Sequence, residues 1–546
     1  MTRDQSLDPR MSDSPEAGSP AATASEGPVS SGSTDGDDSH LLRTRRQKLE
    51  TLRERGVEPF AYHFDRTHPA TEALASFEKA EARGELDEEG RADPIRVAGR
   101  IVSWRGHGRS AFAHIEDGYG RIQLYFRLNV LGDDRFEDLD LLDLGDWVGV
   151  EGPVFRTRTG EATVLAHEWT LLSKSLRPLP RGKEELDAET GERIVHSGFA
   201  DVQSRYRQRY ADLAVNPEVR DVFRLRARVV RSLRAFLDER DYLEVETPIL
   251  QPLYGGAAAR PFTTHHNALD MRLYLRIADE LYLKRLIVGG LERVYEVSKD
   301  FRNEGIDRSH NPEFTMLEFY QAFADYREMM TLVEAMLERV AHEATGGAQV
   351  DYQGTRIDFT PPFRRVSFVD ELSRALGRDL HDMTDADLRE RAREEVDDQV
   401  DGMGRGRLLD KLFGALVEPD LLAPTFVVDY PVELSPLAKP HREDARLTER
   451  FELFVAGREL ANAFSELNDP LDQRSRFLEQ VRLRDAGDDE THPVDEDYLR
   501  AMEYGMPPTG GVGIGVDRLV MLLADQPSIR DVILFPTLRP EEGEGG

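Results

Sequence analysis

The sequence predicts an α+β protein in which a small closed β-barrel precedes a larger domain that mixes helices and strands. The chain has 546 residues, which is too long for one ordinary hydrophobic core, so two or more domains are expected. From Ile95 to Ser173 the pattern consists of short β-type runs, whereas mixed helical and strand patterns follow from about residue 200 to residue 540.

Five short runs make up the predicted barrel. Turn signals such as Asp117-Gly118 and Thr159-Gly160 separate them. Five strands within roughly 80 residues suit a barrel of the OB type, and an unrelated five-stranded barrel is the alternative. The runs are IRVAGRIVSW, SAFAHIED, GRIQLYF, DWVGVEGPVF and EATVLAHEWTLL.

Composition and spacing predict the remaining segments. Residues 1–40 are rich in Ser, Gly, Pro, Ala and Asp and lack a secretory signal, so we expect a disordered acidic tail. Leu42, Leu49 and Leu52 recur at helical spacing, which predicts a helix from Leu42 to Arg55. The expected domains are a helical segment at 41–94, the barrel at 95–175, a connector at 176–200, and the larger domain at 201–546, with a helix at 222–243 and an acidic helical insertion at 344–424.

The composition excludes several classes of protein. Cysteine is absent, which rules out disulfides, thiolate catalysis and Cys-ligated zinc and fits a reducing cytoplasm. No apolar run is long enough to cross a bilayer, so no membrane partner is expected. The net charge is −32, and only 8 of the 71 basic residues are Lys. Such a surface repels nucleic acid at low salt, so either the chain has no such partner or it works in a salty, halophilic cytoplasm, which we favour.

Residues 292–323, ERVYEVSKDFRNEGIDRSHNPEFTMLEFYQAF, predict an antiparallel hairpin with a long polar loop. Strand alternation puts Leu317 and Phe319 on one face and Glu318 and Tyr320 on the other. In the loop, an arginine is suited to hold an α-phosphate and a glutamate to accept from an adenine amino group. A surface hairpin with an Arg–Glu ion pair is the alternative. The candidate site residues at the two ends of this loop are Arg302, Glu304, His310, Asn311 and Phe314.

A second pattern lies in TGGVGIGVDRLVMLLADQPSIRDVILFP, residues 509–536. Gly511, Gly513 and Gly515 alternate along an extended segment, which lets another surface approach the backbone. The spacing fits neither a dinucleotide fingerprint nor a Walker A loop. Arg518 opens the apolar helix that follows, where it is suited to stack on a purine or to reach a γ-phosphate. A plain strand-turn-helix with an exposed arginine is the alternative.

Together with FLDERDYLEVETPIL, residues 236–250, these two runs resemble the three signature motifs of class II aminoacyl-tRNA synthetases, in the required order. The resemblance implies a catalytic domain built on an antiparallel sheet flanked by helices, with the 236–250 segment at a homodimer interface. The class I alternative fails, because there is no HIGH sequence and the lone SKS at 173–175 lies at the end of the barrel.

Two further runs are similar to the bacterial lysyl enzymes of this class: residues 255–305, which begin GGAAARPF, and RELANAFSELNDP at 458–470. Independently, Glu280, Glu318 and Glu466 are acidic residues in motif-bearing segments, and a lysine substrate carries an ammonium at each end. An acidic substrate there would leave uncompensated charge. By resemblance, the residues that bind lysine are Gly256, Glu280, Glu318, Tyr320, Asn462, Phe464 and Glu466.

The resemblance also implies the ATP and metal ligands. Glu459, Gly515 and Arg518 join the loop residues at ATP, with Arg302 and Arg518 catalytic, and Glu459 and Glu466 bind Mg²⁺. Seven residues equal two helical turns, but on a regular strand the two glutamates would face opposite ways, and two surface glutamates are the alternative. Ala461 and Ala463 stand where the family is expected to have Gly, and we expect extended backbone there.

On the tRNA side, Arg105, Phe112 and Gln123 match family positions that meet a U-rich anticodon, where an aromatic ring would stack on unpaired bases. Phe112 in the barrel core is the alternative. The resemblance thus implies a lysine–tRNA(Lys) ligase that forms lysyl-adenylate from ATP. Two rivals stay open: a relative that ligates a lysine-type group onto a translation factor, which would lack the barrel, and a silent tRNA- or protein-binding paralogue, which would be expected to lose Arg302, Glu304 or Arg518.

Overall fold

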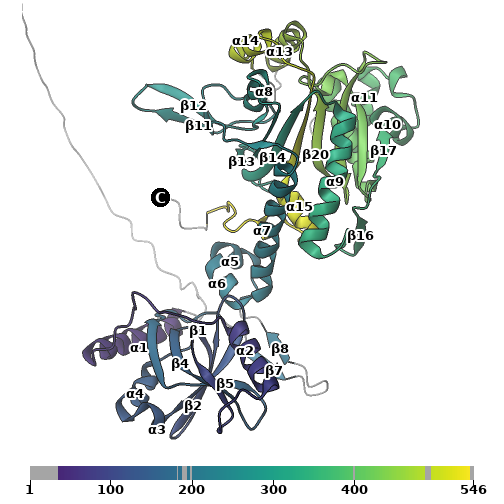
Figure 1. Cartoon of the computed structure of the whole chain (residues 1–546). Helices are drawn as coiled ribbons and strands as arrows, with labels where there is room; N and C mark the ends of the chain where they lie inside the picture. The colour runs from purple at the N-terminus through teal and green to yellow at the C-terminus, as the bar shows by residue number, and fades with distance from the viewer. Residues whose placement is uncertain are drawn as a thin grey trace, which may run out of the picture. The chain divides into compact units, whose positions relative to one another are not determined.

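The structure is a computed structural model that describes residues 35–180, 183–186, 193–196, 199–396, 400–485 and 493–540. The chain divides into two compact units, Met1–Leu179 and Pro180–Gly546 (Figure 1). Of the predicted acidic tail, residues 1–34 lie outside the described residues, as does most of the predicted connector. Within the connector, β7 (Lys183–Leu186) and β8 (Arg193–His196) pair as a short hairpin.

The first unit contains the predicted closed barrel. Its strands pair in the order β1-β2-β3-β5-β4-β6, and an additional pairing of β1 with β4 closes the barrel. The last predicted run is divided into two strands: its first half pairs with β3 and β4, whereas its second half pairs with β4 and not with β3. The strands are β1 (Arg91–His107), β2 (Ser110–Glu116), β3 (Arg121–Arg127), β4 (Trp147–Arg156), β5 (Ala162–Leu165) and β6 (Glu168–Ser173).

Alternation along these strands builds the barrel core. In β2 and β3 every second residue is buried, and the intervening ones are half-buried or exposed, as a pleated strand with one face inward requires. Phe77 of α2 (Ala70–Arg83) is buried in the same core together with Leu124 and Trp169. The short helices α3 (Leu128–Leu131) and α4 (Asp133–Glu137) follow β3.

Helix α1 (Asp35–Glu54) confirms the predicted N-terminal helix but begins earlier, inside the segment expected to be a tail. Leu49 and Leu52 are buried against the barrel, whereas Leu42 is only half-buried. Once part of a helix is anchored by packing, each added residue gains one backbone hydrogen bond without a new nucleation cost, so the helix extends toward the N-terminus.

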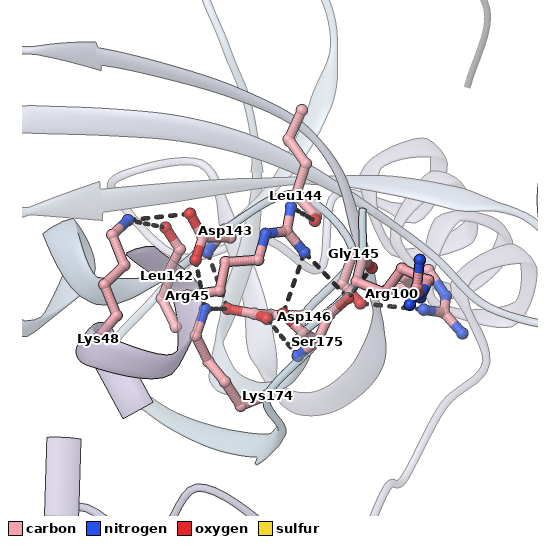
Figure 2. Close-up of polar contacts among 11 residues, drawn as sticks. Arg45, Lys48, Arg100, Leu142, Asp143, Leu144, Gly145, Asp146, Lys174 and Ser175 are labelled. Atoms are coloured by element: carbon pink, nitrogen blue, oxygen red, sulfur yellow. Dashed lines mark hydrogen bonds and ion pairs between the residues drawn. The ribbon is translucent and has the colours of Figure 1, made fainter. Parts of the chain in front are cut away.

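A buried ion cluster fastens α1 to the barrel (Figure 2). The Lys174 ammonium is fully buried and donates to Asp143 Oδ2 at 2.6 Å and to Asp146 Oδ2 at 2.7 Å. Arg45 and Lys48 of α1 bind the segment that carries these aspartates. Arg45 donates to the carbonyl of Leu144 at 2.9 Å, and Lys48 donates to Asp143 at 2.9 Å. The lysine of the SKS run therefore has a structural role.

The second unit is built on an eight-stranded sheet in the order β17-β18-β19-β20-β21-β14-β13-β9, flanked by helices as predicted. All neighbours are antiparallel except β17–β18 and β13–β9. The strands are β9 (Leu243–Glu244), β13 (Arg293–Phe301), β14 (Glu313–Ala322), β17 (Arg364–Ser367), β18 (Thr425–Pro431), β19 (Leu447–Val455), β20 (Arg458–Ser465) and β21 (Thr509–Gly515).

Apolar residues of the sheet pack against long helices. Leu233 and Phe236 of α7 and Val333 and Leu337 of α9 join one core with Phe319 of β14. The predicted helix at 222–243 is α7, which runs from Pro217 to Asp238, since proline suits the first turn and the backbone turns at Asp241 (φ 61°). The helices of this unit include α5 (Val202–Arg207), α6 (Arg209–Val215), α7 (Pro217–Asp238), α8 (Glu280–Val288), α9 (Tyr326–Thr345), α13 (Pro470–Asp485), α14 (Glu496–Glu503), α15 (Val516–Leu523) and α16 (Ile529–Val532).

The predicted insertion at 344–424 is narrower than expected. Its first part holds a hairpin of β15 (Gln349–Tyr352) and β16 (Thr355–Asp358), and β17 belongs to the central sheet. Only the later part is a helical unit with its own core, formed by α10 (Phe368–Leu376), α11 (Asp385–Glu395) and α12 (Arg405–Leu416). A small sheet of β10 (Leu250–Gln251), β12 (Met271–Leu275) and β11 (Thr263–His266) completes the unit. Within the described ranges, every helix is too short or too polar to span a membrane.

Candidate active site

A cavity of about 380 Å³ opens over the middle of the central sheet. Strands β14, β19, β20 and β21, the start of α8 and the loop between β13 and β14 all contribute to its wall. The cavity brings together every residue that the sequence predicts for lysine and ATP. They are Gly256, Glu280, Arg302, Glu304, His310, Asn311, Phe314, Glu318, Tyr320, Glu459, Asn462, Phe464, Glu466, Gly515 and Arg518.

In the hairpin of β13 and β14, strand β14 supplies the floor of the cavity. Its register is regular from Arg293↔Gln321 to Phe301↔Glu313, so the predicted alternation holds. Leu317 and Phe319 point into the core beneath the sheet, whereas Glu318 and Tyr320 line the cavity. The Tyr320 hydroxyl donates to Glu318 at 3.3 Å, and burial raises the pKa of that hydroxyl well above its usual value.

Position 511 of β21 requires glycine because the side chains of Glu466 and Tyr320 lie close to its backbone. It pairs with Tyr320, and a Cβ at this position would lie 2.1 Å from Glu466 Oε1 and 2.4 Å from the Tyr320 ring. Any side chain would therefore enter the space that these two residues occupy. The predicted function of the glycine alternation, to let another surface approach, is confirmed at this residue.

Strand β20 presents Asn462 and Phe464 to the cavity. Ala461 and Ala463 point the other way, into the core, and neither has a positive φ. The expectation of extended backbone there is confirmed, and the two methyl groups lie outside the pocket.

A β-bulge explains how Glu459 shares the cavity with Glu466. The register with β19 shifts between Leu453↔Ala461 and Phe454↔Glu459, which leaves Leu460 without a partner of its own. One extra residue reverses the alternation, so Glu459 falls on the same side as Asn462. The spacing of seven is thus compatible with one cavity on a strand.

One end of the cavity is acidic, and its carboxylates pair with a buried lysine that the sequence reasoning missed. The Lys284 ammonium is fully buried and forms ion pairs with Glu280 and Glu466, which come from different elements. Burial lowers the pKa of Lys284, but attraction to these carboxylates outweighs burial and raises it above its usual value. Burial raises the pKa of Glu280 and Glu466, and Lys284 opposes that shift. Two carboxylates therefore share one ammonium beside the cavity.

The other end of the cavity holds two arginines. Arg302 lies over the Phe314 ring at 5.1 Å, and its Nε donates to the Ile277 carbonyl at 3.4 Å. Arg518 donates to the Glu459 carbonyl at 2.6 Å and to its Oε2 at 3.2 Å. The arrangement separates a carboxylate end from a guanidinium end, which suits a molecule that is cationic at one side and phosphorylated at the other.

The two predicted magnesium ligands differ in their surroundings. The Glu459 side chain is 40% exposed beside Arg518, so it fits a hydrated Mg²⁺ that also binds phosphate oxygens. Glu466 is buried, and Lys284 already contacts one of its oxygens. Glu459 therefore fits the metal, whereas Glu466 is better placed for an ammonium, and its role as a second ligand stays a prediction.

Arg450 is a second residue that sequence reasoning missed. It donates to Asn462 Oδ1 at 3.2 Å, lies over the Phe464 ring at 5.5 Å and pairs with Glu452. It therefore fixes both predicted pocket residues of β20. Its position on β19 directly opposite Phe464 could not be read from the sequence, since the register depends on the bulge.

On the barrel, the three predicted anticodon residues share one outward face. Arg105 pairs with Phe112, and Ser103 pairs with His114, which in turn pairs with Gln123. Phe112 is half-buried and stacks on Tyr125 with ring centroids 4.3 Å apart, so its placement in the core is excluded. Gln123 donates to Glu161 at 2.7 Å. An aromatic pair flanked by polar groups suits stacking of unpaired bases.

Comparison with known proteins agrees with this geometry. The family model for tRNA synthetases class II (D, K and N) matches residues 201–539, and that for the OB-fold nucleic acid binding domain matches residues 95–172. The lysine–tRNA ligase of Pelotomaculum thermopropionicum is 54% identical over 511 residues, covering 93% of this chain and 96% of that protein. The chain belongs to the lysine–tRNA ligase family of class II tRNA synthetases.

Other members of this family are similarly close. The lysine–tRNA ligase of Carboxydothermus hydrogenoformans is 52% identical over 92% of this chain and 98% of its own length. That of Bacillus subtilis is 48% identical over 91% of this chain and 97% of its own length. The predicted resemblance and the predicted order, an OB-fold domain followed by a class II catalytic domain, are thereby confirmed.

Proposed function

We propose that this chain activates L-lysine with ATP to lysyl-adenylate and transfers the lysyl group to the 3′ end of tRNA(Lys). One observation carries the proposal: a single cavity joins a carboxylate end, with Glu280 and Glu466, to a guanidinium end, with Arg302 and Arg518. The family to which the chain belongs supports the same reaction.

At the acidic end, Glu280, Glu318 and Glu466 attract the ammonium groups of lysine. Tyr320, Asn462 and Phe464 limit the length and width of the site. Gly256 adopts a positive φ (90°), and a Cβ there would lie 3.2 Å from Glu280 Cβ, so glycine keeps the entrance open.

At the other end, ATP binds with its α-phosphate at Arg302 and its adenine near Glu304 and Phe314. His310, Asn311, Gly515 and Arg518 surround the remaining phosphates and the ribose. Glu459, with Glu466 as the predicted second ligand, would hold Mg²⁺, whose charge would neutralise the phosphate oxygens.

Two displacements complete the reaction. The lysine carboxylate oxygen bonds to the α-phosphorus as the bond to pyrophosphate breaks, while Arg302 stabilises the charge that develops on the phosphoryl oxygens. The ribose 3′-hydroxyl of tRNA then attacks the mixed anhydride, and AMP leaves. Because catalysis rests on positioning and electrostatics, no protein nucleophile is needed.

The barrel face of Arg105, Phe112 and Gln123 reads the anticodon in this proposal. We also propose a homodimer in the cytoplasm. In the 236–250 segment, Leu243, Ile249 and Leu250 are each between 45% and 52% exposed, and an apolar surface of this kind supports the expected dimer interface.

Amino-acid-dependent exchange of pyrophosphate into ATP, measured with all twenty amino acids at low and at molar salt, tests the function. We expect exchange with lysine alone, together with lysine charging of tRNA(Lys). A Phe112→Ala variant should lower the kcat/KM for charging by roughly 5- to 100-fold, as for loss of one stacked base, without changing exchange. Exchange with another amino acid, or none at either salt concentration, would overturn the proposal. Exchange without charging would favour the translation-factor ligase.

A further inference from the structure

A cluster of three buried carboxylates adjoins the cavity: Glu318 also lines the proposed lysine site, whereas Asp279 and Asp300 have no part in the proposed reaction. Asp279, Asp300 and Glu318 each offer one oxygen, and these oxygens lie within 4.8 Å of one another. Asp279 and Asp300 have no solvent exposure, and Glu318 is 6% exposed. In the part of the chain that the structure describes, no other three His, Asp or Glu side chains bring their ligand atoms this close together.

The fold forces these side chains together. On β13 the pleat puts Glu296, Ser298 and Asp300 on one face, and Glu318 of β14 lies directly opposite Glu296. Asp279 immediately precedes α8, and its backbone N–H donates to Glu318 Oε1 at 3.4 Å. The cluster therefore connects the start of α8 with both strands of the hairpin.

The nearby cations do not balance this charge. Arg276 lies 2.9 Å from Asp279 Oδ1 and 3.4 Å from Asp300 Oδ1, and it also pairs with Glu296 at 2.7 Å. Arg302 attracts Asp300 from the cavity side. When all four carboxylates are ionised, they outnumber the two guanidinium groups by two, and uncompensated charge in a buried place is costly.

Ser298 supplies an independent indication of a ligand. It is 3% exposed and lies on the same face of β13 as Asp300. Among the described residues, the Ser298 hydroxyl has no hydrogen-bond partner. The four carboxylate oxygens of Asp279 and Asp300 have none either, apart from the ion pairs with Arg276. Buried polar atoms are nearly always paired, so these atoms indicate an additional partner at their centre.

We propose that Asp279, Asp300, Glu318 and the Ser298 hydroxyl bind a divalent metal ion of the hard, oxygen-preferring class, such as Mg²⁺. Carboxylates and a hydroxyl are the ligands that such ions prefer, and two positive charges match the excess of two carboxylates. The ion would hold Asp279, which adjoins Glu280, and Asp300, two residues from Arg302. It would therefore brace both ends of the cavity, and it is distinct from the metal at Glu459.

Binding of Mn²⁺ to the metal-stripped full chain, without ATP or lysine, tests this site. The free ion is measured by electron paramagnetic resonance in molar KCl, which screens weak binding to the acidic surface. We expect one site per chain that Mg²⁺ displaces. The double variant Asp279→Asn/Asp300→Asn should weaken this site at least 100-fold, and Ser298→Ala should weaken it severalfold. Glu459→Gln should leave it unchanged.

The proposal is overturned if the wild-type chain binds no Mn²⁺ under these conditions, as it would if protons alone neutralise the cluster. It is equally overturned if the double variant keeps the site or if Glu459→Gln removes it. The amides keep the shape of the aspartates and remove repulsion, so the metal-free double variant should unfold at the same temperature as wild type or higher. Lysine-dependent pyrophosphate exchange by the wild-type chain reports separately on the proposed function.

Discussion

Each of the two units contains a buried lysine that is paired with two carboxylates. The two sites differ in the other hydrogen bonds that those carboxylates make. Lys174 of the barrel lies between Asp143 and Asp146, and Lys284 of the catalytic unit lies between Glu280 and Glu466. Both ammonium groups are fully buried. Each is therefore paired with two carboxylates, as a buried charge requires.

The difference lies in what else the carboxylates bind. Asp146 accepts from the backbone N–H of Ser175 at 2.7 Å and from that of Asp143 at 2.8 Å, so both of its oxygens are satisfied (Figure 2). Glu466 makes no hydrogen bond of ordinary geometry beyond its ion pair with Lys284, and it lines an open cavity. A completed network belongs to the fold, whereas an incomplete one beside a cavity is ready for a ligand.

The largest effect is expected on stability, from Lys174→Met. Removing the ammonium leaves Asp146 buried without its counter-ion, which should destabilise the barrel unit by about 3–5 kcal/mol. Thermal unfolding should show an earlier barrel transition, while lysine-dependent exchange at temperatures where the variant is folded stays at the wild-type level. The exposed Lys79→Met in the same unit is the control and should leave the transition in place. An unchanged transition in Lys174→Met would contradict the structural role of this cluster.

Glu466→Gln should instead weaken the binding of lysine more than it changes stability. The variant keeps the shape of the side chain but removes a charge that the substrate ammonium needs, so lysine should bind about 2–5 kcal/mol more weakly, roughly 30- to 5000-fold. The KM for lysine in pyrophosphate exchange should rise, and the KM for ATP should change far less. Glu503→Gln on the exposed side of α14 removes one charge from the same unit and serves as control. An unaltered KM for lysine would show that Glu466 does not hold the substrate.

Gly511→Ala should have a smaller effect on lysine binding at the acidic end of the cavity. Its Cβ would lie 2.1 Å from Glu466 Oε1, so Glu466 or Tyr320 must shift. Strain of this kind costs about 1–3 kcal/mol, so the KM for lysine should rise roughly 5- to 150-fold. Gly347→Ala, where a Cβ meets no atom within 4 Å, tests the effect of a methyl group alone. If both variants behave like wild type, Glu466 can move freely and the pocket is less rigid than its packing indicates.

The sequence was a good guide wherever the information is local. Alternation within one hairpin correctly predicted that Glu318 and Tyr320 share a face, and turn residues located the barrel strands. Glu280 and Lys284 are four apart on a helix, so their pairing could also have been inferred from spacing. It was missed because the charged residues of that segment were read as substrate ligands alone.

What the sequence could not give depends on distant pairing. The bulge at Leu460, which turns Glu459 toward the cavity, is set by the register with β19. Likewise, β17 joins the central sheet through parallel pairing with β18, roughly 60 residues further along, so its run was assigned to the insertion. The buried group of Asp279, Asp300 and Glu318 arises from three elements, and its members carry no common spacing.

Glu418, in the turn Glu418–Asp420 after α12, provides a third and smaller case: a carboxylate whose neighbours are mostly other acids. Burial, with Glu452 and Glu459 nearby, raises its pKa from the usual 4.5 to about 8. Between these values the folded chain holds a proton that the unfolded chain has lost, so stability should fall as pH rises through this window. Glu418→Gln should unfold like wild type at pH 4.5 and be more stable by about 1 kcal/mol or more at pH 8, measured by urea unfolding at fixed salt. The direction of this change in stability distinguishes Glu418 from the carboxylates of the two lysine-paired sites. If Glu418→Gln is instead less stable than wild type at pH 8, Glu418 is charged and paired in the folded chain.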